Sequence, residues 1–139
     1  REYLRAERTA DRRGRPRWLT TPLDPKQPIK VGEGILVRLT LTATAPLERL
    51  LVEDPRPAGF EIDQVLPPGA ERPWALSAEA RDDKAAFFVT SVEAGDTVIE
   101  YLLRPEIPGL WTALPAFVGG MYDPGISARS AEARLRIMP

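Results

Sequence analysis

The chain has 139 residues, of which 43% are hydrophobic, with a formal net charge of −1 and with neither cysteine nor histidine. This length fits one domain with its own core, and the two zeros exclude disulfides, thiolate metal sites, cysteine nucleophiles and histidine-based triads. The near-neutral charge provides no overall field for nucleic acid, and no apolar run reaches the roughly 18 residues that span a bilayer.

The N-terminal segment is the most basic part of the chain. It begins at Arg1 with charged residues and no apolar signal-peptide core, so we expect a processed product or an excised piece of a larger protein. A strand is expected over residues 1–8 and a returning arm over 15–20. Seven arginines against three acidic residues give the first 17 residues a net charge of +4. With little aromatic interleaving, a solvated hairpin tip is favoured over a nucleic-acid site.

The clearest strand signal follows a proline-rich loop at residues 21–28. Over residues 35–43, long or β-branched side chains alternate with period two, so the odd residues should face a core and the even ones mostly water. A short buried strand is expected over 50–53. Asp54, which precedes Pro55, should hydrogen-bond to its own backbone in a turn, in preference to forming an edge of a calcium site.

The rest of the chain repeats the same pattern of short strands and turns. Trp74 and Leu76 are expected to fasten the end of a polar loop, residues 67–73, to the body of the domain. Further strands are expected over residues 60–62, 78–81, 85–90, 98–104, 110–114 and 129–137, with a short helix over residues 75–80 left open as an alternative. Strands of about 5–8 residues predict an all-β fold, an antiparallel β-sandwich of about seven to nine strands like Ig or fibronectin-III domains. We expect residues 1–139 to form one such domain.

Side chains suited to catalysis are scarce. The three lysines lie in or beside turns, where no desolvated pocket is expected for a nucleophilic amine. Asp82 and Asp83 are adjacent, so their carboxylates should point apart and cannot share a proton. The glycines at 32 and 34 open a strand and not a helix, which excludes a phosphate-binding loop. We therefore expect neither an enzyme nor a bound cofactor or metal.

One connecting stretch, residues 114–125, looks most like a presented surface. It carries Met121 and Tyr122 on a backbone loosened by two glycines and stiffened by Pro124. Both residue types are enriched at interfaces, but they could equally plug one end of the sandwich. Residue chemistry leaves these two interpretations open, and it also leaves open a free-standing adhesion or carbohydrate-binding module.

Several segments, taken in order and at their spacing, resemble bacterial α2-macroglobulins over essentially the whole chain. The segments are Arg1-Glu2-Tyr3, Val52 to Glu61 (VEDPRPAGFE), Arg81-Asp82-Asp83-Lys84, Tyr101 to Arg104, Pro108 to Trp111, and Met121-Tyr122-Asp123-Pro124. The chain departs from the family pattern at Arg56, where leucine is usual, and at Trp111, where phenylalanine is frequent.

The resemblance implies a macroglobulin-like β-sandwich, the last such domain of a large protein and the counterpart of the eukaryotic receptor-binding domain. It implies a parent that inhibits many proteases by trapping them, as a host-defence protein of the periplasm or cell envelope, with an inner-membrane lipoprotein as one form. The isolated domain is expected to be monomeric and to insert into no membrane. Target proteases would meet the parent.

The resemblance also implies a partner for the Met-Tyr stretch. In family members with a thioester, this domain packs on the thioester domain and on other macroglobulin domains, and its Met-Tyr loop shields the reactive bond from water. Carried over, Met121 and Tyr122 take the shielding role, while Asp123 and Pro124 shape the loop. With no cysteine, the segment cannot supply the thioester itself. We expect Tyr122 at an end or edge of the sandwich, at least partly exposed.

Overall fold

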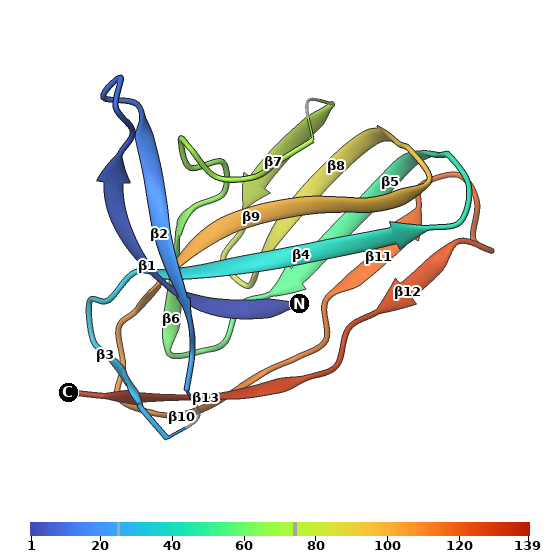
Figure 1. The fold of residues 1–139 in the computed structure, drawn as a ribbon. Coiled ribbons are helices and arrows are strands. Elements are labelled where there is room, and N and C mark those ends of the chain that lie inside the picture. The colour runs from blue at the N-terminus through green and yellow to red at the C-terminus, as the bar shows by residue number, and fades with distance from the viewer. Residues whose placement is uncertain (25, 74) are drawn as a thin grey trace.

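The computed structural model describes residues 1–24, 26–73 and 75–139. Within those ranges it contains thirteen strands and no helix (Figure 1), which confirms the all-β prediction. The expected number of seven to nine strands was too low. Two strands lie largely outside the expected ones. No strand was expected at β3 (Ile29–Lys30), and only the last residue of β12 (Ser127–Arg129) falls within an expected strand. They are too short to produce a period-two pattern.

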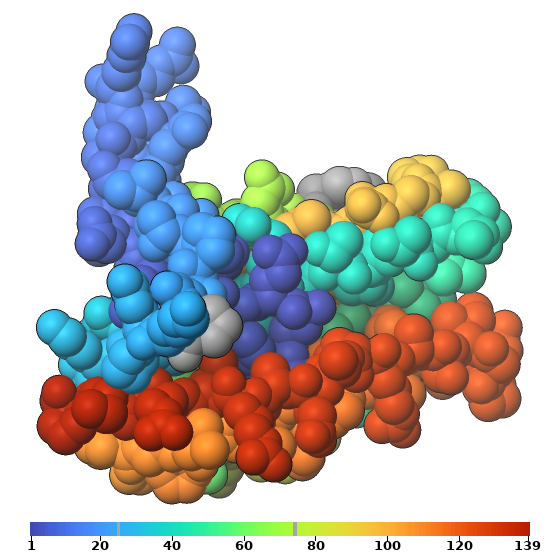
Figure 2. Space-filling model, turned by 60° about the horizontal axis from the view of Figure 1, so that its bottom comes forward, coloured from blue at the N-terminus to red at the C-terminus, as the bar shows by residue number. Residues whose placement is uncertain are grey.

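The first sheet has the strand order β2–β1–β4–β9–β6, with antiparallel neighbours throughout. Its members are β1 (Glu2–Ala10), β2 (Pro16–Pro22), β4 (Ile35–Ala43), β9 (Gly95–Pro105) and β6 (Phe60–Gln64). The predicted hairpin at the N-terminus is therefore present, although its strands extend further than expected. In Figures 1 and 2 this hairpin projects away from the body of the molecule.

The second sheet faces the first and has the order β12–β11–β5–β8–β7. Its longer members are β5 (Leu47–Pro55), β8 (Lys84–Val92), β7 (Leu76–Ala80) and β11 (Phe117–Gly120). A small third sheet combines β10 (Gly109–Ala113), β13 (Ala133–Met138) and β3. The pairing of β13 with β3 is parallel, an exception to the expected antiparallel order.

The main core lies between the first two sheets. The residues at 35, 37 and 39 on β4 are buried there, as the period-two pattern predicted, and so are Ile99, Tyr101 and Leu103 on β9. Phe87 from the facing sheet meets Tyr101 with ring centroids 5.6 Å apart and planes at 48°. A tilted aromatic pair of this kind adds about 0.5–1.5 kcal/mol beyond the burial of its area.

The outer face of β4 differs from expectation at one position. Thr40 and Thr42 are exposed, but Leu36 is buried. It packs with Leu4, Ala6 and Leu102 in a small second cluster. The cause is the β1–β2 hairpin, which curls over this end of the sheet and covers the face that the alternation assigned to water.

Two further observations complete the fold. Leu76 is half-buried and packs against the main core, whereas Trp74 lies outside the described residues. In the described part of the chain, no helix is long and apolar enough to cross a membrane.

Candidate functional site

The Met-Tyr stretch forms the loop between β11 and β12, which we call the 121–126 loop. It lies at the end of the sandwich where β4 turns into β5 (Figure 1). β11 pairs with β5 on one side and with β12 on the other. The loop is therefore the tip of a hairpin at an edge of the second sheet.

Backbone and side-chain hydrogen bonds fix the shape of the loop. The N–H of Gly125 donates to Oδ1 of Asp123 over 3.0 Å, and the N–H of Ile126 donates to the Asp123 carbonyl over 3.2 Å. The N–H of Gly120 donates to the Ile126 carbonyl over 3.0 Å. A Cβ at Gly120 would lie 2.6 Å from the Asp123 carbonyl oxygen, so the turn needs glycine there.

A residue on β5 holds the loop from outside. Arg49 has φ of 54°, in the left-handed region that side chains other than glycine rarely adopt. Its carbonyl accepts a hydrogen bond of 2.8 Å from the N–H of Met121. The backbone of the loop is thus tied to the sheet beside it at the residue that begins the Met-Tyr pair.

The two large side chains of the loop point into solvent in this chain. Met121 is 47% exposed and Tyr122 is 78% exposed. The exposure of Tyr122 excludes a role for its side chain as a plug of the sandwich end, whereas the Met121 side chain is about half covered. Tyr122 lies at an end of the sandwich and is exposed, as expected.

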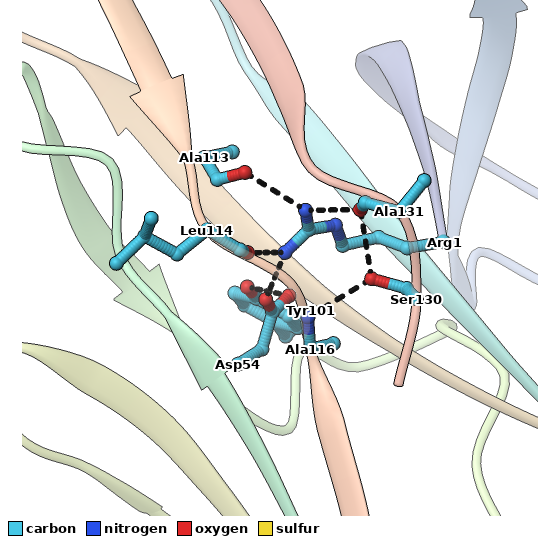
Figure 3. A network of polar contacts seen from close by, with 8 residues as sticks. All are labelled: Arg1, Asp54, Tyr101, Ala113, Leu114, Ala116, Ser130 and Ala131. Atoms are coloured by element: carbon cyan, nitrogen blue, oxygen red, sulfur yellow. Dashed lines mark hydrogen bonds and ion pairs between the residues drawn. The ribbon is translucent and has the colours of Figure 1, made fainter. Parts of the chain in front are cut away.

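A buried polar network lies at the other end of the same hairpin (Figure 3). The guanidinium of Arg1 pairs with Asp54 over 2.5 Å from Nη1 to Oδ1, and the two side chains are 2% and 0% exposed. Nη1 also donates to the Leu114 carbonyl over 2.6 Å. Nη2 donates to the carbonyls of Ala113 over 3.2 Å and Ala131 over 3.0 Å.

Asp54 has a second partner on the opposite sheet. The hydroxyl of Tyr101 on β9 donates to Oδ2 of Asp54 over 2.6 Å. Burial raises the pKa of Asp54, while Arg1 and the Tyr101 hydroxyl act in the opposite direction. Burial, together with the neighbouring Asp54 carboxylate, raises the pKa of Tyr101 well above its ordinary value. Tyr101 is therefore a neutral hydrogen-bond donor here, and the network is a buried, hydrogen-bonded ion pair suited to holding strands together.

The network holds the base of the β11–β12 hairpin. Leu114 and Ala131 lie just outside its two strands, and both carbonyls accept from Arg1. The same two segments are joined to each other, because the N–H of Ala116 donates to Oγ of Ser130 over 2.9 Å. The hairpin that carries the 121–126 loop is thus clamped at its base to β1, β5 and β9.

The prediction for Asp54 was wrong. Asp54 lies inside β5 and is fully buried, whereas a turn before Pro55 was expected. The sequence did contain a signal for this. The even-numbered residues Leu50, Val52 and Asp54 of this strand all direct their side chains to the core. A carboxylate on a buried face requires a charged or hydrogen-bonding partner.

Among the described residues, no group of three or more histidine, cysteine or acidic side chains is arranged to hold a metal ion. The candidate site therefore consists of an exposed loop and the buried clamp beneath its hairpin.

A family model of the bacterial alpha-2-macroglobulin MG10 domain matches residues 4–125. The chain belongs to this family. The resemblance stated from the sequence is thereby confirmed, and the VEDPRPAGFE segment of this MG10 member contains Asp54, the acid of the clamp.

Relatives of known sequence and structure agree with this assignment. Alpha-2-macroglobulin of Xylella fastidiosa (strain 9a5c) is 28% identical over 144 residues, which cover 88% of this chain and 9% of that protein. The native conformation of E. coli alpha-2-macroglobulin has a TM-score of 0.72 at 25% identity, covering 98% of this chain and 9% of that one.

Two crystal structures give similar values. E. coli alpha-2-macroglobulin from domain MG7 to the C-terminus has a TM-score of 0.71 at 26% identity, covering 98% of this chain and 23% of that one. Salmonella alpha-2-macroglobulin reacted with methylamine has a TM-score of 0.69 at 26% identity, covering 98% and 9%. The MG10 chain thus spans about a tenth of the length of the curated relatives it matches.

Proposed function

We propose that residues 1–139 form one domain of a bacterial α2-macroglobulin that traps proteases in the periplasm or cell envelope. The domain takes no catalytic part and acts through contacts with neighbouring domains of the parent chain, while target proteases meet the parent as a whole. Family membership supports this proposal, and so does the small share of the relatives' length that the chain covers.

We further propose that the 121–126 loop packs on the thioester domain of the parent and shields its reactive bond, with Asp123 and Pro124 shaping the loop. The observation that carries this proposal is the exposure of Met121 and Tyr122, at 47% and 78%, on a fixed turn. A thioester survives only where water is excluded, and a large thioether beside an aromatic ring can cover such a bond.

The clamp beneath the hairpin supports the same role. A contact surface that is already ordered loses little conformational entropy when it docks. The hydrogen bonds of Asp123, Arg49 and Arg1 hold the tip and the base of the hairpin in one geometry. The loop therefore needs little reorganisation when the thioester domain packs against it.

The experiment uses a full-length parent that carries the thioester. The double variant Met121→Ala with Tyr122→Ala is expected to lose the thioester to methylamine about tenfold faster, which corresponds to about 1.4 kcal/mol of barrier. The measurement is the rate of methylamine incorporation followed by mass spectrometry.

A matched control removes two other exposed apolar side chains, Ile107 and Leu110, each 52% exposed. The variant Ile107→Ala with Leu110→Ala should react at the wild-type rate. Equal rates for wild type, control and the Met-Tyr variant would refute the shielding role.

A further inference from the structure

Strand β4 is paired along its whole length on one side only. β9 pairs with it from Ile35 to Ala43, whereas β1 pairs with it from Ile35 to Arg38. In the part of the chain that the structure describes, no strand pairs with residues 39–43 on the β1 side. In an antiparallel strand, alternate residues direct their N–H and C=O groups to each side. This free edge is a template for another strand.

The free edge forms one wall of an apolar groove of about 430 Å³. The opposite wall is the β11–β12 hairpin, and core side chains contribute to the lining. In Figure 2 the furrow lies between the teal atoms of β4 and the red atoms of β12, with the dark-blue start of β1 at one end. The lining includes Leu39, Leu41, Leu47, Val118 and Ile126.

The register of β1 shows how an upstream continuation would lie. Glu2 is opposite Arg38 and Tyr3 is opposite Val37, so Arg1 reaches the level of Leu39. A chain that continued in the same direction before Arg1 would pass successive β4 residues from 40 to 43.

The alternation of side chains along β1 extends this argument. Arg1 has a buried side chain and Tyr3 packs against the main core, whereas Glu2 between them is exposed. Side chains on a strand alternate between its two faces. The second and fourth residues before Arg1 would therefore point into the groove, opposite Leu41 and Ala43.

We propose that, in the multidomain chain, the residues immediately preceding Arg1 continue β1 as a strand along residues 39–43 and fill this groove with apolar side chains at those two positions. The relatives are about ten times as long as this chain, so a parent protein of that length has residues outside this domain that can supply the added strand. Because β1 is directed into the groove, an upstream segment can enter it without a change in backbone direction. The apolar lining suits apolar side chains on that segment. The proposal is independent of the shielding role.

The added strand would connect domains. It would lie between β4 and β12 and so contact the hairpin whose tip is the 121–126 loop. The position of the preceding domain would then be transmitted to that hairpin through a continuous strand, without a flexible linker at the boundary.

A cross-linking experiment in the full-length parent tests the register. Leu41→Cys is combined with cysteine at the second residue before Arg1. Directly opposed residues in an antiparallel pair have Cβ atoms about 4.5–5.5 Å apart, so mild oxidation is expected to form a disulfide. Thr40→Cys with the same upstream cysteine is the control and should not cross-link, because Thr40 faces the other side of the sheet. Cross-linking of both pairs, or of neither, contradicts the proposed register.

Hydrogen exchange of residues 39–43 in the full-length parent provides an independent readout. The amides directed to the free edge are expected to be protected, and proline at the first and third residues before Arg1 should reduce that protection at least tenfold, since proline donates no ladder hydrogen bond. Rapid exchange in the unmodified parent overturns the proposal. Protection that survives the proline variant also overturns it, because another segment would then occupy the groove.

Discussion

Asp11 shows how a single side chain sets a turn. Its carboxylate accepts hydrogen bonds from the N–H groups of Arg13 over 2.8 Å and Arg15 over 2.9 Å, and from Nε of Arg15 over 2.7 Å. The backbone hydrogen bond from Arg15 is the main cause that lowers the pKa of Asp11 from its ordinary 3.8, and that from Arg13 adds to it. The charged form is thus the one that orders the tip of the β1–β2 hairpin.

The pH dependence of this turn follows from the direction of that shift. A lowered pKa in the folded state means that the contribution is complete above about pH 4 and is lost as the pH falls through the lowered pKa. In an NMR titration, the Arg13 and Arg15 amide resonances should move together with a midpoint below 3.8. In Asp11→Asn they should not move in this range. A midpoint at or above 3.8 would contradict the assignment.

At the scale of elements, Arg56 connects two turns that are distant in sequence. Its Nε and Nη2 donate to the Asp82 carbonyl over 2.9 and 2.7 Å, and its Nη1 donates to the Phe60 carbonyl over 2.5 Å. Its backbone N–H donates to the Asp83 carbonyl over 2.8 Å. The guanidinium of Arg56 therefore joins the turn after β5 to the tip of the β7–β8 hairpin.

Replacement of this arginine by leucine tests that connection. Arg56→Leu removes donors to two backbone carbonyls and is expected to lower the free energy of unfolding by about 1.5–3 kcal/mol, the range for hydrogen bonds to charged groups. Arg81→Leu is the control, since Arg81 pairs with Glu79 on the exposed surface and should cost less than about 1 kcal/mol. Urea denaturation measures both, and equal losses would argue against the connection.

At the scale of the whole molecule, the Arg1–Asp54 pair and its hydrogen bonds join all three sheets. Asp54→Ala leaves a buried guanidinium without its counter-charge, so the free energy of unfolding should fall by about 3–5 kcal/mol. Its neighbour Glu53 pairs with Lys84 near the surface, and Glu53→Ala should cost less than about 1 kcal/mol. The two variants are compared by urea denaturation, and a similar loss in both would count against the buried pair as the central clamp.

The period-two alternation of the sequence predicted the long strands that have one face on the main core. The alternation on β4 and on β9 identified both strands and their inward residues, because one face of each is covered by the second sheet. The same reasoning missed Leu36, which is covered by a hairpin that the alternation cannot place. It also missed Asp54, whose partners lie 53 residues before it and 47 after it. The exposure of Met121 and Tyr122 could not be predicted from the sequence, because it depends on where the 121–126 loop lies relative to the two sheets.

The clamp also sets an order of events during synthesis. Its guanidinium belongs to Arg1, the residue directly before β1, while the carbonyl of Ala131 that it binds lies 130 residues later. Until that carbonyl has left the ribosome, the charge on Arg1 must stay hydrated, since a buried charge without its partners costs several kcal/mol. The two sheets can therefore close around Asp54 only after almost the whole domain has been synthesised, so that closure joins the first and last parts of the domain in one folding step.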